Sequence, residues 1–302
     1  MILAAIVLLW KGSQWLVEAA SRIARVLGMS DLAIGLTVVS LGTSAPEFAV
    51  TINAALQGRA DISVGNVVGS NIFNMGFILG GCAVVRAIQT TPKMVWRDGL
   101  LLVIVSLLLI AFSYDGVFSR TDGAIFLTIL VGYIAWLFWK RESPPEDGVA
   151  EEEATWKDAP FLLAGIAGVV GGGHLLVHAA SEIARGYGVS EWVIAVTIVA
   201  AGTSLPELAT SLTAALKGHH GISAGNLIGS DIFNLLGVLG VAGLIRPLEV
   251  HESAFGSLIV LVIMVTVVTV FLRTGWQLSR REGVILVGAN LIRWVMDFMG
   301  KG

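Results

Sequence analysis

Two glutamates lie inside apolar stretches of this chain, each directly after a proline. Glu47 closes the segment GTSAPE at residues 42–47, and Glu207 closes the segment GTSLPE at residues 202–207, 160 positions later. An ionised side chain in an apolar membrane segment is costly, and such residues usually mark an ion path or a binding site. Two of them in matched segments therefore predict one shared cation site.

Proline opens the backbone next to each glutamate. Pro46 has no N–H and its ring crowds the carbonyl four residues earlier, so the oxygen of Gly42 loses its helical partner. We expect the oxygen of Thr43 to tilt outward too, on the helix face that carries Glu47. Irregular backbone persists in lipid only where it is buried or lines a cavity. Each segment should thus present a carbonyl, a hydroxyl from Thr43 or Ser44, and a carboxylate. The second copy offers the same groups from Gly202, Thr203, Ser204, Pro206 and Glu207.

A polar stripe follows each glutamate segment on the next predicted helix. Asn66, Ser70 and Asn74 are spaced i, i+4 and i+8, which places them on one helix face, one short turn after Ser63. The second copy repeats the stripe at Ser223, Asn226, Ser230 and Asn234. These hydroxyl and amide oxygens are expected to complete the cage. Glycines spaced by four predict close packing between helix backbones. They are Gly65, Gly69, Gly225 and Gly229.

All of these groups are hard oxygen ligands. Calcium prefers about six to eight oxygens in a flexible geometry, and the same set suits several sodium ions. No Cys or His set suited to zinc or copper lies near the motifs, and Cys82 is the only cysteine. The alternative is a proline-kinked packing helix with a neutralised glutamate, which the recurrence in both copies disfavours.

Asp231 and four histidines are interpreted as lying outside the cage. Asp231 stands where the first copy has Asn71, and its one-residue offset turns it about 100° away from Ser230, so we expect it to pair elsewhere. The first two histidines have no histidine counterparts in the first copy and are expected to serve packing or the membrane interface, and the last two to be solvated in a loop. They are His174, His178, His219 and His220.

A composition this apolar excludes an ordinary soluble domain. The chain is 55% hydrophobic and 14% charged, with a mean hydropathy of +0.83. The first apolar stretch is interpreted as a span and not as a removed signal peptide, since no charged region or cleavage site accompanies it. Nothing resembles a nucleic-acid-binding surface. We predict an all-α polytopic membrane protein with ten transmembrane helices. They are residues 1–20, 31–57, 62–86, 94–114, 121–139, 159–183, 191–216, 222–246, 253–273 and 283–299.

The two copies divide the chain into halves of five spans. Between residues 42–80 and 202–240, 21 of 39 positions are identical, which indicates an internal duplication. The first half is predicted over residues 1–141 with a repeat at about 31–86, and the second over 159–302 with a repeat at about 191–246. Because five is odd, the second half enters the membrane from the opposite face, and such inverted repeats are typical of secondary transporters. Residues 142–158, rich in acid and proline, are predicted to be a solvated linker.

Basic residues orient the predicted spans. The loops expected on one side of the membrane carry twelve Lys and Arg residues, whereas the side that holds both termini carries six. The positive-inside rule places the richer side in the cytoplasm. We therefore expect a multi-pass protein of the cell membrane with both termini extracellular and the acidic linker cytoplasmic.

At these motifs the chain resembles the calcium/cation antiporter superfamily, and in particular prokaryotic sodium/calcium exchangers. The resemblance rests on the doubled GTS-x-PE and GN-x-x-GS-x-IFN patterns and on the five-plus-five plan, so it covers nearly the whole chain. It implies a secondary active antiporter, and not an enzyme, that exchanges Na⁺ for Ca²⁺ across the membrane by alternating access. No cofactor is implied, and a monomer suffices for this mechanism.

The resemblance also implies roles for individual residues. Glu47 and Glu207 would be the central carboxylates for Ca²⁺, joined by the carbonyls of Thr43 and Thr203. Na⁺ would bind to hydroxyl and backbone oxygens beside them, at Ser44, Ser70, Ser204 and Ser230 and near Ser40 and Ala200. Asn74 and Asn234 would lie at the centre of the cage. Some members, including potassium-dependent ones, carry Asp at the position of Asn234, so K⁺ coupling is disfavoured.

Charge balance supports an exchange cycle. Two carboxylates supply a charge of −2, which one Ca²⁺ or two Na⁺ neutralise; a three-for-one ratio comes from the resemblance alone. The long first and sixth helices, with Gly12 and glycines 171–173, would slide over the motif helices. An empty site leaves two desolvated carboxylates close together, so at least one should take up a proton, and acid should inhibit transport. Exchange rates that stay flat from mildly acidic to alkaline pH would contradict this.

Three other functions remain open on the same motifs. A proton-coupled exchanger of Ca²⁺ or another divalent cation is the main alternative, with H⁺ as a competitor of Na⁺; the GN-x-x-E motif usual in that branch is missing. An intramembrane enzyme would need a nucleophile with a base or a catalytic metal set, which the motifs lack. A passive channel would not show strict dependence on a counter-ion.

Overall fold

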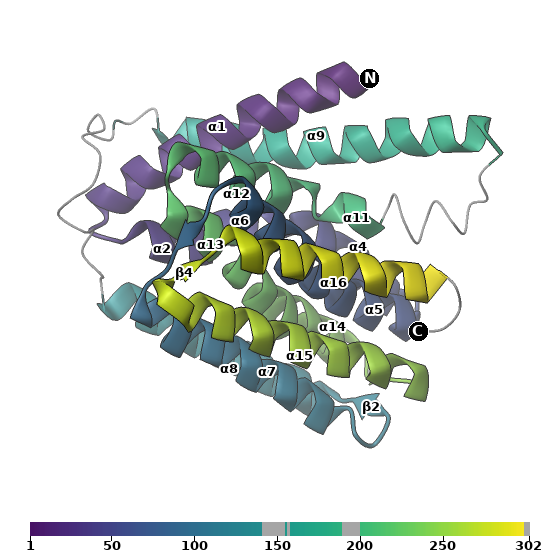
Figure 1. The fold of residues 1–302 in the computed structure, drawn as a ribbon. Helices are drawn as coiled ribbons and strands as arrows, with labels where there is room; N and C mark the ends of the chain where they lie inside the picture. Colours follow the sequence, from purple (N-terminus) through teal and green to yellow (C-terminus); the bar gives the residue numbers. More distant parts are fainter. Residues whose placement is uncertain (141–154, 156–157, 189–199, 299–302) are drawn as a thin grey trace.

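A computed structural model describes residues 1–140, 155, 158–188 and 200–298, and almost all of the described chain is helical. Figure 1 shows long helices along the top and along the bottom of the molecule, with the remaining helices packed between them. The α-helices are α1 (Ile2–Val26), α2 (Asp31–Ile34), α3 (Ser40–Thr43), α4 (Ala45–Leu56), α5 (Ala60–Phe73), α6 (Gly80–Val85), α7 (Leu100–Phe112), α8 (Arg120–Lys140), α9 (Asp158–Gly186), α11 (Ala200–Thr203), α12 (Leu205–Lys217), α13 (His220–Ile232), α14 (Gly240–Ile245), α15 (Glu252–Arg273) and α16 (Arg280–Phe298).

Several of these helices are joined by π-helical turns, which the sequence did not predict. The π-helical segments are Gly35–Val39, Asn74–Leu79, Met94–Gly99 and Phe233–Leu239. Short π-helical insertions inside helices frequently occur at functional sites, because they shift the side chains that follow. Two of these described segments begin at or next to Asn74 and Asn234, which are predicted from the sequence to lie in the cage.

Seven described helices are long and apolar enough to cross a membrane, and one bent pair brings the number to eight. They are Ile2–Val26, Ala60–Val85, Met94–Phe112, Arg120–Lys140, Asp158–Gly186, His220–Ile245 and Ala254–Trp276, with the bent pair Asp31–Thr43 and Ala45–Leu56. These match eight of the ten predicted spans. Residues 191–199 of the predicted seventh span lie outside the described residues. Helix α16, the predicted tenth span, is too rich in charge to meet the same criterion.

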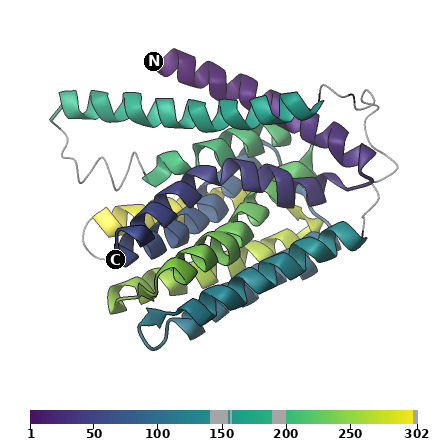
Figure 2. The ribbon, with the colours of Figure 1, turned by 180° about the vertical axis from the view of Figure 1, so that it is seen from behind.

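Helices α1 and α9 lie side by side along one edge of the molecule, as both views show (Figures 1 and 2). Gly12 sits so close to α9 that a Cβ there would stand 2.8 Å from the backbone nitrogen of Val169. On α9, Gly172 would likewise meet the backbone of Leu9 at 2.9 Å. Glycine therefore permits the contact between the two long helices. Of the glycines expected to face the motif helices, Gly173 does so, because a Cβ added there would lie 3.4 Å from Cδ of the Pro206 ring.

The spans Ala60–Val85 and His220–Ile245 form the centre of the protein. In their most apolar 18-residue windows 72% and 78% of the residues are buried, against 22–39% in the five other single-helix spans. Gly225 and Gly229 pack directly against the backbone of Leu32 and Leu36, which confirms the predicted close seam on α13. At Gly65 and Gly69 of α5, no described atom lies within 4 Å of an added Cβ.

Two short antiparallel ribbons tie the halves of the chain together. β1 (Ile88–Gln89) pairs with β4 (Gln277–Leu278), and β2 (Val117–Phe118) pairs with β3 (Leu248–Glu249). The last helix of each half also packs on the other half, α8 against α14 and α16 against α6. Both sets of contacts recur at the 160-residue offset. The site thus lies inside a core that both halves build.

Candidate ion-binding site

The two motif glutamates lie at the centre of the protein, and each is bound by a serine of the other motif. The hydroxyl of Ser44 donates to Glu207 Oε1 at 2.9 Å, and the hydroxyl of Ser204 donates to Glu47 Oε1 at 3.0 Å. All four side chains are fully buried. Since each bond joins residues 157 or 163 positions apart, the two motifs face one another directly.

A proline bend places each glutamate at the start of a new helix. Pro46 stands in the first turn of α4, and the axes of Asp31–Thr43 and Ala45–Leu56 differ by 52°. Ser44 forms the break with φ −79° and ψ 10°, and Ser204 forms the equivalent break before α12 with φ −90° and ψ 9°. Pro46 has no N–H to donate to the carbonyl of Gly42. The bend therefore turns Ser44 toward the opposite motif.

Two asparagines of the polar stripes brace the glutamate helices. Asn66 Nδ2 donates to Thr51 Oγ1 at 3.0 Å, and Asn226 Nδ2 donates to Ser211 Oγ at 2.9 Å. Thr51 and Ser211 lie one turn after the glutamates of their own helices. Asn226 Oδ1 also accepts a hydrogen bond from Thr43 Oγ1 at 3.0 Å. The amide groups of this pair thus fix α4 and α12 against α5 and α13.

Ser70 and Ser230, the serines of the two polar stripes, make different hydrogen bonds. Ser230 Oγ lies 3.4 Å from Glu207 Oε1 and donates to it, and it also lies 3.5 Å from Thr43 Oγ1. Ser70 Oγ donates to the backbone oxygen of Asn66 at 2.7 Å, within its own helix. Ser230 is therefore in contact with a motif carboxylate in this conformation, whereas the bond described for Ser70 is local.

A second group of four polar side chains joins α5 and α13 next to the glutamates. Asn74 Nδ2 donates to Asp231 Oδ1 at 3.0 Å, and Asn234 Nδ2 donates to Asn71 Oδ1 at 3.2 Å. Asn71 Nδ2 also donates to the backbone oxygen of Asp231 at 3.1 Å. All four side chains are fully buried. Asp231 was expected to lie outside the cage and pair elsewhere, but its described side-chain partner is Asn74, a predicted cage residue.

Several buried oxygens at this centre have no hydrogen-bond partner among the described residues. They are Glu47 Oε2, Glu207 Oε2, Asn74 Oδ1, Asn234 Oδ1 and Asp231 Oδ2. A buried polar atom without a partner is costly, and in native proteins such atoms are rare and call for a water or an ion. The donor set is made of oxygen alone, which suits hard cations such as Ca²⁺ and Na⁺.

The structure brings most of the predicted site residues together. The buried residues among them are Ser40, Thr43, Ser44, Glu47, Ser70, Asn74, Thr203, Ser204, Glu207, Ser230 and Asn234. Ala200 is the first residue of α11, and its side chain lies outside the described residues. Thr51, Ser211, Asn71 and Asp231 were not predicted as site residues. The signal for Thr51 and Ser211 is their place one turn after each glutamate in both copies.

The histidines do not form a metal site. Within the described residues, no three His, Cys, Asp or Glu side chains converge as they would around one metal ion. His174 and His178 are exposed on α9. His219 was expected to be solvated, but its side chain is 10% exposed and its Nδ1 lies 2.9 Å from Asp31 Oδ2, so this expectation is wrong. His219 instead links the start of α13 to the start of α2.

The fold and this centre define a multi-pass helical membrane protein with a buried, oxygen-lined core shared by two matched motifs. The family description Sodium/calcium exchanger protein matches residues 1–139 and 158–295. The chain belongs to this family of cation antiporters.

Similar proteins agree with this assignment. CaxA of Alkalimonas amylolytica is 39% identical over 94% of this chain and 93% of its own. The sodium/calcium exchanger MaX1 of Methanosarcina acetivorans is 33% identical, over 95% and 94%. The solved structure of the sodium-calcium exchanger NCX_Mj superposes with a TM-score of 0.86 at 33% identity, covering 96% of this chain and 95% of its own. The prediction of a prokaryotic exchanger is confirmed at the level of the family.

Proposed function

We propose that this protein exchanges Na⁺ for Ca²⁺ across the membrane by alternating access, through two inverted five-helix repeats. The observation that carries the proposal is the reciprocal pair of bonds from Ser44 to Glu207 and from Ser204 to Glu47. It brings two carboxylates from equivalent positions of the two halves to one buried centre. Their charge of −2 matches one Ca²⁺ or two Na⁺. The names of MaX1 and NCX_Mj, both sodium/calcium exchangers, support the same pair of ions.

In this proposal Ca²⁺ binds between Glu47 and Glu207 and the backbone oxygens of Thr43 and Thr203. Na⁺ binds to flanking hydroxyl and backbone oxygens at Ser44, Ser70, Ser204 and Ser230 and near Ser40 and Ala200, with Asn74 and Asn234 at the centre. The unpartnered Oε2 atoms of both glutamates support this arrangement. Na⁺ and Ca²⁺ compete for overlapping oxygens, which makes their binding mutually exclusive and couples the two fluxes.

Calcium-45 uptake into proteoliposomes tests the proposal. Vesicles loaded with Na⁺ are compared with Na⁺-free vesicles and with vesicles under a pH gradient, for the wild type and for Glu47→Gln and Glu207→Gln. We expect uptake that needs internal Na⁺ and is lost in both variants, while Glu249→Gln, which removes an exposed carboxylate of β3, behaves as the wild type. Uptake driven by the pH gradient alone would establish proton coupling instead. Normal uptake in either motif variant would refute the site.

A further inference from the structure

We propose that the ion pair between Glu18 and Lys217 is a latch that stabilises the conformation of this structure against the opposite conformation of the transport cycle. Lys217 Nζ, at the end of α12, donates to Glu18 Oε1 on α1, and the two side chains are 31% and 38% exposed. One helical turn earlier on α12, Thr213 Oγ1 lies 2.7 Å from Ser13 Oγ of α1. This latch rests on the proposed alternating access, and it makes one of the two conformations the favoured one.

Helix α1 packs closely on α12 in this conformation (Figure 1). Leu16, Val17 and Ala20 of α1 are fully buried, and they form one apolar cluster with Ala214 of α12. Between the described residues of α9 and α4, the equivalent helices at the 160-residue offset, there is no contact of comparable extent. Alternating access in inverted repeats moves one bundle against the other, so we expect the two halves to exchange these arrangements. The contact of α1 with α12 is therefore the one that must separate.

The counterparts of the two latch residues cannot form an equivalent ion pair. At the 160-residue offset, Glu18 corresponds to His178 and Lys217 corresponds to Gln57, which carries no charge. Both counterparts are exposed in this conformation. The serine that supports the latch corresponds to Gly173, which has no hydroxyl group. An ion pair is thus available to one of the two conformations only, and its free energy favours the conformation in which α1 packs on α12.

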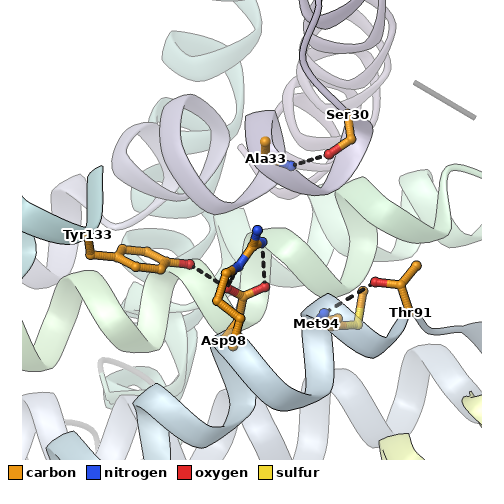
Figure 3. A network of polar contacts seen from close by, with 7 residues as sticks. Ser30, Ala33, Thr91, Met94, Asp98 and Tyr133 are labelled. Carbon is orange, nitrogen blue, oxygen red and sulfur yellow. Dashed lines mark hydrogen bonds and ion pairs between the residues drawn. The ribbon is translucent and has the colours of Figure 1, made fainter. Parts of the chain in front are cut away.

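A second polar network shows what distinguishes the latch. Asp98, on the π-helical turn before α7, contacts the guanidinium of Arg97 and accepts a hydrogen bond from the hydroxyl of Tyr133 on α8 at 2.8 Å (Figure 3). All three residues belong to the first half, and α7 and α8 lie on the opposite side of the molecule from α1 (Figure 1). This network can therefore stay intact in both conformations, whereas the pair of Glu18 and Lys217 must break when α1 leaves α12.

The 160-residue offset supplies matched variants. Glu18→Gln and Lys217→Gln each remove one charge of the latch, and the double variant Glu18→Lys with Lys217→Glu restores the pair with its charges exchanged. The double variant His178→Glu with Gln57→Lys builds the pair between α9 and α4, where it would stabilise the opposite conformation. Tyr133→Phe removes a polar contact between two helices away from α1 and serves as the control.

The reaction of a buried cysteine with a water-soluble maleimide, in the purified full-length protein, measures how often α1 leaves α12. Ala214→Cys places this cysteine in the apolar cluster between the two helices, and the natural Cys82 is buried in the central core. Ala20→Cys, in the same cluster, gives the same comparison if Ala214→Cys does not fold, as judged by gel filtration.

We expect Glu18→Gln and Lys217→Gln to raise the rate of this reaction by about two- to fivefold, the effect of losing one partly exposed ion pair. The variant with exchanged charges should react at the original rate. The pair built at residues 57 and 178 should raise the rate as well, because it stabilises the conformation in which α1 has left α12. Tyr133→Phe should leave the rate unchanged.

Equal reaction rates with and without the charges of Glu18 and Lys217 would overturn the latch. So would a rate raised to the same extent in Tyr133→Phe, because the loss of any polar contact would then have the same effect. Na⁺-dependent calcium-45 uptake by the wild type, together with equal maleimide rates in all variants, would refute the latch and leave the proposed exchange standing. The expected maleimide rates in a protein without such uptake would support the latch and refute sodium/calcium exchange.

Discussion

The reciprocal serines connect the two halves of the chain directly. A hydrogen bond to a charged group contributes about 1.5–3 kcal/mol, more than a bond between neutral groups. Ser44 and Ser204 each donate to a motif carboxyl group in a fully buried position. Each serine therefore holds a carboxylate whose helix belongs to the other half.

At this scale we predict that Ser44→Ala and Ser204→Ala weaken Ca²⁺ binding to a similar extent. Loss of one bond of this kind should raise the Ca²⁺ concentration for half-maximal uptake by about tenfold or more. Initial rates of calcium-45 uptake over a range of Ca²⁺ concentrations measure the effect. Ser106→Ala is the control, because Ser106 is buried on α7 and its hydroxyl donates to the backbone of its own helix. An effect in one motif variant alone would contradict the reciprocal arrangement.

The sequence predicted which residues lie together at the centre, but not which side chain of one motif bonds to which side chain of the other. The duplicated motifs place Glu47 and Glu207 in one cage, yet nothing in either motif shows that each carboxylate accepts from the other motif's serine. Helical periodicity predicted that Asp231 points away from Ser230 and misses the cage, but Asp231 bonds to Asn74. That periodicity describes one helix only, so it carried no information on Asn74 as the partner across the interface.

At the scale of elements, the bends at Pro46 and Pro206 create the site. We predict that Pro46→Ala lowers Na⁺-dependent uptake with little change in melting temperature. Alanine restores an N–H that lets the helix continue and takes the carbonyl of Gly42 back into its hydrogen bonding. Proline in the first turn of α4 costs little, so its removal adds little stability. Uptake and thermal unfolding in detergent are measured together, with Pro247→Ala in a non-helical connection as control. Normal uptake in Pro46→Ala would show that the bend is not required.

The close contact between α1 and α9 depends on glycine, because a larger side chain would collide with the neighbouring backbone. We predict that Gly12→Ala lowers the free energy of unfolding by about 1–3 kcal/mol, because the added methyl group would overlap the backbone of α9. A Cβ at Gly12 would lie 2.8 Å from Val169 N, whereas at Gly132 on α8 no described atom lies within 4 Å. A melting temperature lowered in Gly12→Ala but not in Gly132→Ala would confirm the packing. Equal melting temperatures would contradict it.

Helix boundaries were predictable only where apolar runs end at polar residues. The predicted spans 94–114, 121–139 and 253–273 lie within a few residues of the helical segments observed. The π-helical turns at Asn74–Leu79 and Phe233–Leu239 were missed, because a one-residue insertion leaves no mark on hydropathy. The first span was predicted to end at residue 20, but α1 continues to Val26. Its last residues are polar enough to leave the apolar run while remaining helical.

At the scale of the whole molecule, the antiparallel ribbon of β1 and β4 pairs residues 88–89 of the first half with residues 277–278 of the second. Directly paired residues of an antiparallel ribbon are about 4.5–5.5 Å apart at Cα, which suits a disulfide. We predict that Gln89→Cys with Gln277→Cys, which are paired in register, forms a disulfide under oxidising conditions. After cleavage at a protease site introduced within residues 142–154, the two halves should migrate together on a denaturing gel and separate on reduction.

Single-cysteine variants provide the control for this cross-link. Cys82 is the only natural cysteine and is buried, so it should not react. Halves that separate without reductant in the double variant would contradict the register of β1 and β4.

The reciprocal bonds also bear on the order in which the protein is made. Glu47 emerges from the ribosome long before Ser204, its hydrogen-bond partner, has been synthesised. A chain that has inserted only its first half therefore holds one motif carboxylate without the serine that binds it and without the second carboxylate. The centre is completed only when the second motif enters the bilayer. A half-made protein in the membrane thus holds only one half of this buried, oxygen-lined centre.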